Sequence, residues 1–198
     1  SSELELWVKA DTLGLTGGTP VAGWTDSSGN GRSLAQTNAA LRPVYTAGVL
    51  NGQPVVRFTA DYFNSLTLPS AGNEFALVAV MKAANTGAYH NIIDDDAGAR
   101  PMLWIDTAGN YEFSYNSGAV APRGPGYDLV FAVKRNSGTQ FSQLYLNGPS
   151  VTAGSSVNHT VPASTVYDLF NRDGGQAFNG DVAELMIFST ALTTDEIK

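Results

Sequence analysis

The sequence contains no cysteine, which excludes disulfide bonds, thiolate zinc sites and cysteine nucleophiles. Charged residues make up only 15% of the 198 residues, and the 11 Lys and Arg form no basic run that could follow a phosphate backbone. The formal net charge is -7, so we expect no nucleic-acid partner. No apolar run approaches the roughly 18 residues of a membrane-spanning helix, and we expect no membrane insertion.

Hydrophobic residues, by contrast, make up 43% of the chain, together with 21 Gly and 9 Pro. Short apolar segments bounded by turn residues recur throughout and predict antiparallel strands. FALVAVMKA at 75–83 and DLVFAVK at 128–134 are almost continuously apolar, which predicts strands covered on both faces. We therefore predict an all-β protein whose two antiparallel sheets pack as a sandwich. The other strands are predicted in LELWVKA, PVAGWTD, RPVYTA, PVVRFTA, NSLTLP, HNIID, PMLWID, YEFSYN, FSQLYLN, TVYDLF and DVAELMIFS.

Two further segments have their own predictions. VLNGQ, around Asn51-Gly52, is typical of a tight hairpin turn because both residues tolerate positive φ. The polar stretch from Gly148 to Pro162 indicates a long loop. Residues 1–198 are expected to form one domain, a module of a larger protein.

Several blocks together resemble the laminin-G-like branch of the concanavalin A-like lectin and glucanase superfamily. They occur in order along the whole chain: LELWVKADTLGL, VAGWTDSSGNGRSLAQ, RPVY, LNGQPVVRFTADYFNSL and FNGDVAELMIFSTALTTDEI. The resemblance implies a jelly-roll sandwich in which the first and last strands are neighbours, followed by a small helix.

The last residues support that ending independently. Thr193-Thr194-Asp195-Glu196 fits a capping box, in which the Thr193 hydroxyl and the Glu196 carboxylate each accept from the other residue's amide. Leu192 is expected to pack beneath this turn. Because one turn cannot sustain itself, we predict that it docks on the sandwich or continues past Lys198.

Catalysis is not expected. Related glycoside hydrolases carry a Glu-x-Asp-x-x-Glu strand that places nucleophile and acid/base on one face, and this pattern is absent. Glu184, the closest candidate, is expected to be a structural carboxylate. His90 and His159 are the only histidines, and no G-x-S-x-G elbow is present, which argues against a serine hydrolase.

An acidic cluster indicates a possible metal site. Asp94, Asp95 and Asp96 follow one another at the end of a predicted strand, and clustered carboxylates on a loop suit Ca²⁺. The resemblance also implies one calcium ion at a rim of the sandwich. The alternative is an acidic turn that keeps the strand end solvated and unpaired.

An aromatic hairpin is the predicted carbohydrate site. If Asp106 lies opposite Tyr111, then Trp104 faces Phe113 and Met102 faces Tyr115 on one side of the sheet. Flat rings suit the C–H faces of sugars, with Asp106 at the polar rim and with Tyr89 and His90 in a neighbouring loop. The alternative is that this face points inward and the rings belong to the core, as the usual burial of aromatic residues favours.

The sequence thus predicts a non-catalytic carbohydrate-binding or adhesion module, with a glycan as partner. We expect it in a secreted, cell-surface or phage structural protein, and therefore outside the cell or on a virion. One alternative is a structural or assembly module that binds a protein neighbour and no sugar. Another is a glycosidase with diverged catalytic acids.

Overall fold

The computed structural model describes residues 4–68, 74–95, 100–113, 118–135, 138–139, 141–156, 166–172 and 175–198. Strands dominate this part of the chain, with two 3₁₀ turns, η1 (Ala10–Thr12) and η2 (Ala39–Leu41). The strands are β1 (Leu4–Lys9), β2 (Gly23–Trp24), β3 (Leu34–Ala35), β4 (Val44–Leu50), β5 (Gln53–Thr59), β6 (Leu66–Thr67), β7 (Phe75–Ala83), β8 (His90–Asp95), β9 (Arg100–Ile105), β10 (Asn110–Phe113), β11 (Ala119–Pro122), β12 (Asp128–Lys134), β13 (Ser142–Leu146), β14 (Val151–Ser155), β15 (Val166–Leu169) and β16 (Asn179–Phe188).

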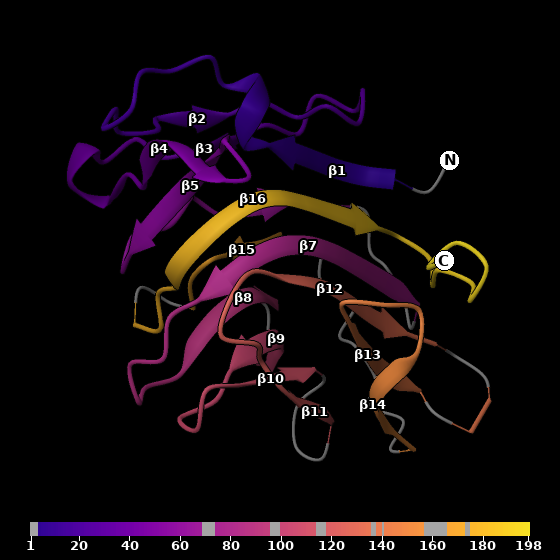
Figure 1. The fold of residues 1–198 in the computed structure, drawn as a ribbon. Helices are drawn as coiled ribbons and strands as arrows, with labels where there is room; N and C mark the ends of the chain where they lie inside the picture. Colours follow the sequence, from indigo (N-terminus) through magenta and orange to yellow (C-terminus); the bar gives the residue numbers. More distant parts are fainter. Residues whose placement is uncertain are drawn as a thin grey trace.

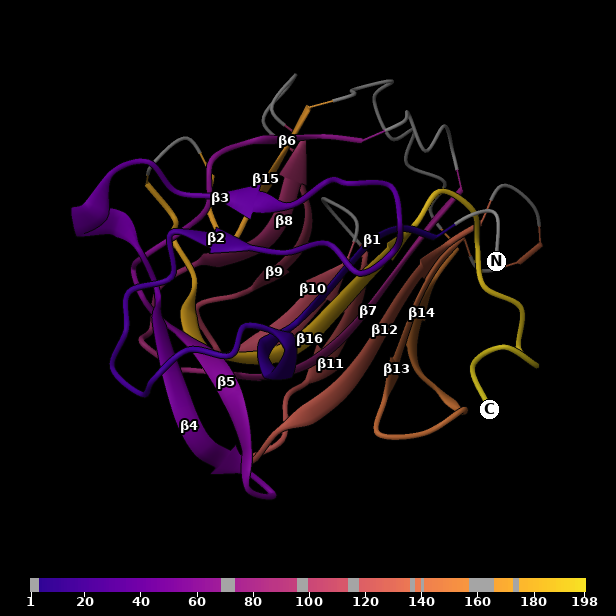
Figure 2. The same cartoon turned by 90° about the horizontal axis from the view of Figure 1, so that it is seen from above.

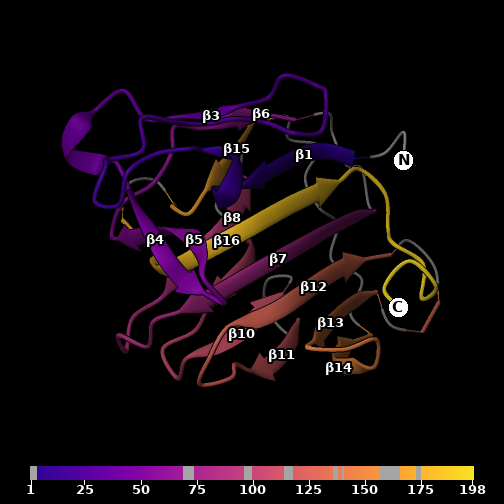
Figure 3. The ribbon, with the colours of Figure 1, turned by 45° about the horizontal axis from the view of Figure 1, so that its top comes forward.

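Two antiparallel sheets form the sandwich. The eight-stranded sheet has the order β14-β13-β12-β7-β16-β5-β4, with β1 also paired to β16. The six-stranded sheet has the order β11-β10-β9-β8-β15-β6. Strands β16, β7, β12, β13 and β14 follow one another across the molecule, with the second sheet behind them (Figures 1 and 3). The predicted all-β, two-sheet jelly-roll architecture is confirmed.

The centre of the eight-stranded sheet is apolar on both faces, as predicted for its two most hydrophobic strands. On β7, Leu77 and Ala79 face the core between the sheets, whereas Ala76 and Val78 belong to a second cluster on the outer face. The C-terminal segment covers part of that outer face, so both faces of β7 are buried.

Strand β16 connects most of the eight-stranded sheet. Its first half pairs with β5 and its second half with β1, while β7 runs along its other side. Gly180 is required where β16 begins beside β7, because a Cβ there would lie 2.3 Å from the Lys82 carbonyl oxygen. The first and last strands are therefore neighbours, as the family resemblance implied. The predicted Asn51-Gly52 turn is also confirmed, since both residues have positive φ between β4 and β5.

The β9–β10 hairpin has a different register from the predicted one. Ile105, not Asp106, lies opposite Tyr111, so that Glu112 pairs with Trp104 and Phe113 with Leu103. The cause is the connection, because the Asp106 amide donates to the Asn110 carbonyl and Gly109 takes a positive φ. A shift of one residue moves Trp104 to the opposite face from Phe113, and the predicted pairing is wrong.

The stretch predicted as a loop from Gly148 to Pro162 contains an edge strand, β14, which pairs with β13. Strand β11 was not predicted either. In both strands the apolar side chains are small or exposed, so neither gives a clear hydrophobic pattern. Edge strands need little burial to form, and the loop prediction was wrong for Val151–Ser155.

The C-terminal turn docks on the outer face of the eight-stranded sheet, on the side away from β8 and β9 (Figure 2). Leu192 and Ile197 are buried there against Phe131, Val133 and Tyr145. The predicted capping box is present. The Thr193 amide donates to Glu196 Oε2 over 2.8 Å, and the Glu196 amide donates to Thr193 Oγ1 over 3.3 Å.

In the described residues, no helix is both long enough and apolar enough to cross a bilayer.

Candidate functional site

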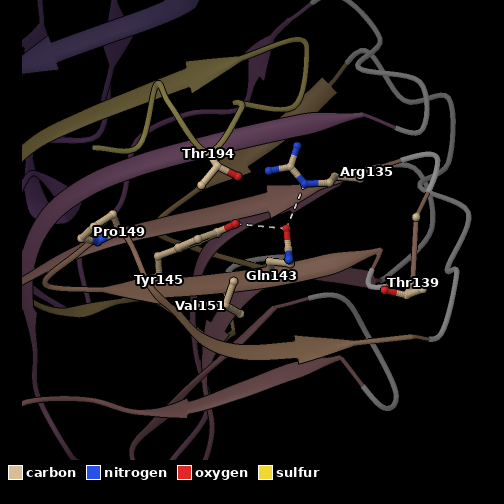
Figure 4. Close-up of a pocket in the computed structure, with 8 residues that line it drawn as sticks. Arg135, Thr139, Gln143, Tyr145, Pro149, Val151 and Thr194 are labelled. Atoms are coloured by element: carbon tan, nitrogen blue, oxygen red, sulfur yellow. Dashed lines mark hydrogen bonds between the residues drawn. The ribbon is translucent and has the colours of Figure 1, made fainter.

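A shallow groove lies on the outer face of the eight-stranded sheet, across β12, β13 and β14 (Figure 4). Its volume is about 260 Å³, slightly below the roughly 300 to 1,000 Å³ of common small-molecule pockets. We call it the outer groove. Its lining residues are Arg135, Gly138, Thr139, Gln143, Tyr145, Pro149, Val151 and Thr194.

The local structure explains why these side chains meet. Successive residues of a strand point to opposite faces, so Gln143 and Tyr145 of β13 share the outer face. Arg135 continues β12 into the following turn, where its amide donates to the Phe141 carbonyl. The capped C-terminal turn brings Thr194 over the same face (Figure 4). Residues far apart in the sequence therefore converge on one hollow.

A hydrogen-bonded group forms the polar side of the outer groove. Gln143 Oε1 accepts from Arg135 Nε over 2.9 Å and from the Tyr145 hydroxyl over 3.1 Å (Figure 4). Because a guanidinium can only donate, the Gln143 oxygen must face it, which fixes the orientation of the amide. Tyr145 is only 2% exposed, so its ring forms a floor and offers no open stacking face.

Chemically, this arrangement suits recognition of a polar ligand. Guanidinium, amide and hydroxyl groups read sugar hydroxyls and carboxylates, while Pro149 and exposed Val151 provide apolar contact area. Among the described lining residues there is no carboxylate and no nucleophile with an adjacent base. The described lining residues therefore offer donors and acceptors for binding, and none of them is a general acid or base of the usual kind.

A second polar cluster lies on the same sheet. Arg57 donates to both carboxylate oxygens of Asp181 over 2.7 and 2.8 Å, and the Tyr127 hydroxyl donates over 2.7 Å. Burial by itself raises the pKa of Asp181, but these hydrogen bonds outweigh burial and hold the pKa below its usual value. Because Arg57 lies on the same sheet and Tyr127 directly precedes one of its strands, we interpret this cluster as structural.

The predicted aromatic platform does not exist as one surface. Tyr111 and Phe113 are buried in the core between the sheets, so the inward-facing alternative is correct for these two rings. Trp104 lies on the opposite face, where it is 4% exposed and hydrogen-bonded to Glu112. The side chain of Tyr115 lies outside the described residues.

The other predicted sugar-binding residues are scattered. The Asp106 carboxylate accepts from the amides of Ala108 and Asn110 over 2.9 and 2.8 Å, and so stabilises its own turn. His90 is buried: its Nδ1 donates to the Ala177 carbonyl over 2.8 Å and its Nε2 accepts from the Thr86 hydroxyl. Tyr89 is 48% exposed and is the one predicted aromatic, among those described, that is open to solvent.

The predicted calcium ligands are described only in part. Asp94 is buried and forms an ion pair with Arg172, at 3.4 Å between Oδ2 and Nε. Asp168 on β15 is paired with Asp94 on β8, and its carboxylate accepts from the Ser65 hydroxyl over 2.6 Å. The side chain of Asp95 and all of Asp96 lie outside the description. No group of three or more His, Cys, Asp or Glu suited to a metal occurs within the described residues, and the calcium site stays a prediction.

Glu184 has a structural partner. It accepts from the indole nitrogen of Trp7 over 2.5 Å, across the β1–β16 pair. This contact is the structural role expected of a lone carboxylate between apolar neighbours.

Comparison with known families agrees with this architecture. A laminin-G-like family, described as the concanavalin A-like lectin/glucanases superfamily, matches residues 59–198. The chain belongs to this superfamily. No curated protein sequence matches the chain significantly.

Solved structures share the fold of this lectin-like domain. Domain 4 of AbnA, a GH43 extracellular arabinanase from Geobacillus stearothermophilus solved with arabinotriose, has a TM-score of 0.63 and 14% identity, covering 98% of this chain and 96% of that one. Trypanosoma rangeli sialidase with the inhibitor DANA has a TM-score of 0.61 and 14% identity, covering 96% of this chain. The lectin-like domain spans 31% of that sialidase, less than a third of its length. Identities this low show the fold alone.

Sequence reasoning missed the outer groove of the lectin-like domain. Arg135 and Gln143 are eight positions apart and have no motif around them, and Thr194 belongs to a distant segment. One signal was available: FSQLYLN alternates, with Gln143 and Tyr145 at every second position. Gln143 is the polar residue in this otherwise apolar alternation. A polar side chain at such a position indicates that this part of the outer face is open to solvent.

Proposed function

We propose that the protein is a non-catalytic carbohydrate-binding module whose outer groove receives the sugar. The observation that carries this proposal is the convergence of Arg135, Gln143 and Thr194 around a hollow of about 260 Å³ on a lectin-like fold. The structural neighbour solved with arabinotriose, which has the same fold over nearly its whole length, supports the ligand class.

Binding without catalysis follows from the groove's chemistry. Glycoside hydrolysis uses two carboxyl groups about 5 to 9.5 Å apart, flanking the scissile bond. The described lining residues supply none, and Glu184 is bound to Trp7 on another part of the sheet. This domain therefore attaches to a glycan without cleaving it.

A shallow groove gives weak single-site binding, which repetition on a multivalent particle would offset. We propose a secreted, cell-surface or virion location for the parent protein, where glycans are displayed. We also retain calcium at Asp94 to Asp96 as part of the proposal.

A glycan array in calcium and in EDTA tests the function, using the wild type and two variants. Gln143→Ala removes the acceptor that holds Arg135 and the Tyr145 hydroxyl, so we expect the array signal to fall about tenfold or more. Tyr89→Ala, which truncates the exposed aromatic predicted beside the aromatic hairpin, should leave the signal unchanged.

If Tyr89→Ala loses the signal and Gln143→Ala keeps it, the binding site lies around Tyr89 and not in the outer groove. A signal insensitive to EDTA would remove calcium from binding. Absence of any glycan signal for the wild type would contradict the proposal and favour a structural module that binds a protein neighbour.

A further inference from the structure

We propose that the outer groove selects saccharides that carry a carboxylate, and that Arg135 binds this group. The inference rests on the proposed carbohydrate-binding function and specifies its ligand class. It follows from three features of the groove: its charge, the geometry of the guanidinium, and the way in which neighbouring acids are already paired.

Among the described residues, the groove carries one positive charge without a carboxylate partner. Arg135 is the only ionisable side chain other than the Tyr145 phenol among the described lining residues, and it has no ion-pair partner in the described part of the chain. Asn136, Ser137 and Gln140 are not ionisable and lie outside the described residues. Arg135 is half-buried, and it stands out as a cationic group on a protein whose net charge is -7.

The two acids that follow Thr194 in the sequence, Asp195 and Glu196, are already engaged within the C-terminal turn. Asp195 Oδ1 forms an ion pair with Lys198 Nζ over 2.8 Å. Glu196 Oε2 accepts from the amide and the hydroxyl of Thr193, each over 2.8 Å. Neither carboxylate is bonded to Arg135, although Thr194 beside them lines the same groove. A carboxylate supplied by a ligand would complete the pairing.

The guanidinium is also oriented in advance. Its Nε donates to Gln143, while its two terminal nitrogens have no hydrogen-bond partner in the described residues. Anchoring at Nε limits rotation of the planar group and leaves its terminal N–H groups for a ligand. These donors suit the two oxygens of a carboxylate, which a single ammonium group cannot match. Little side-chain entropy then remains to be lost on binding.

The experiment compares oligogalacturonate with its methyl ester, in which a neutral ester replaces each carboxylate on the same sugar chain, by calorimetric titration. We expect the acid to bind about 10- to 100-fold more tightly than the ester, because a charge-assisted bidentate pair replaces neutral hydrogen bonds. Arg135→Gln should abolish this preference, and Arg135→Lys should restore only a small part of it.

Lys82→Gln is the matched control, since it removes one positive charge from the exposed part of the same sheet outside the groove. It should keep the full preference for the acid. Thermal melts of each variant confirm folding, and a sulfated oligosaccharide tests whether the groove takes carboxylates or any anion.

Equal binding of acid and ester, or a preference that survives in Arg135→Gln, would overturn the inference while leaving carbohydrate binding intact. Binding of neither ligand, together with an empty glycan array, would overturn the proposed function as well. Preference for the sulfated ligand over the carboxylate would also contradict the assignment.

Discussion

Trp104 and Glu112 face each other on the outer face of the six-stranded sheet, where the indole donates to the carboxylate. Burial, with a smaller contribution from the charge of Asp106, raises the pKa of Glu112, and the bond from Trp104 opposes that shift. The pair thus combines a large buried ring with a half-buried acid. A ring in this setting contributes to stability and is too enclosed to stack on a sugar.

Trp104→Ala should therefore lower the free energy of unfolding by about 3 to 5 kcal/mol, the usual cost of truncating a buried aromatic. Val120→Ala is the control, because Val120 lies in the same row across β10 but is 46% exposed. It should change stability by about 0.5 kcal/mol or less. Urea unfolding measures both values. Unchanged stability in Trp104→Ala, with loss of glycan binding, would reinstate Trp104 as a sugar platform.

At the scale of elements, the C-terminal turn connects packing to the candidate site. Leu192 and Ile197 hold it on the sheet, the capping box closes it, and Thr194 forms part of the groove. A single turn has little stability of its own, so its geometry depends on these contacts.

Thr193→Ala removes the hydroxyl that accepts from the Glu196 amide, and we expect that amide to exchange with solvent at least several-fold faster. Affinity for glycan should fall a few-fold because Thr194, which lines the outer groove, becomes mobile. Hydrogen exchange and calorimetry give the two readouts. The control, Thr152→Ala, removes a hydroxyl from edge strand β14 and should leave exchange at Glu196 unchanged. Faster exchange without any loss of affinity would show that Thr194 plays no part in binding.

Elements differ in how well their sequences predict them. The two faces of β7 are apolar, so the pattern of FALVAVMKA alone gave its ends correctly. The register of the β9–β10 hairpin depended instead on whether Asp106 pairs with Asn110 or with Tyr111. Strand propensities do not settle that choice, because the three residues between Asp106 and Asn110 form the connection. The alternation in FSQLYLN pointed to Gln143 and Tyr145, but Thr194 was not predictable as a groove residue, since it reaches the groove only through tertiary docking of the C-terminal turn.

At the scale of the whole molecule, Asp181 on β16 joins Arg57 on β5 and Tyr127, the residue before β12. Its folded-state pKa lies below the ordinary value of 3.8. The unfolded chain therefore takes up the proton first as pH falls, and the stabilisation is complete above pH 3.8 and is lost below it.

Asp181→Asn should lower stability at pH 7 by about 1.5 to 3 kcal/mol, the range for hydrogen bonds to a charged group. The difference from wild type should shrink when pH is lowered through the folded-state pKa of Asp181. Asp195→Asn, a carboxylate whose side chain is 89% exposed, is the control and should show almost no effect at either pH. Chemical denaturation at pH 7 and pH 2.5 measures the differences. A constant difference across this range would show that the charge of Asp181 is not what stabilises the sheet.

Strand β16 is formed from residues 179–188, yet it lies in the interior of the eight-stranded sheet, between β7 on one side and β1 and β5 on the other. During synthesis these three strands leave the ribosome long before their shared partner, and each has an unpaired edge until it arrives. Such edges can pair with other chains. The sheet is completed by contacts between residues as far apart as Leu4 and Phe188, so closure is expected to be slow and to follow synthesis of nearly the whole domain. A nascent chain stalled before residue 179 would therefore be prone to aggregation and would be a substrate for chaperones.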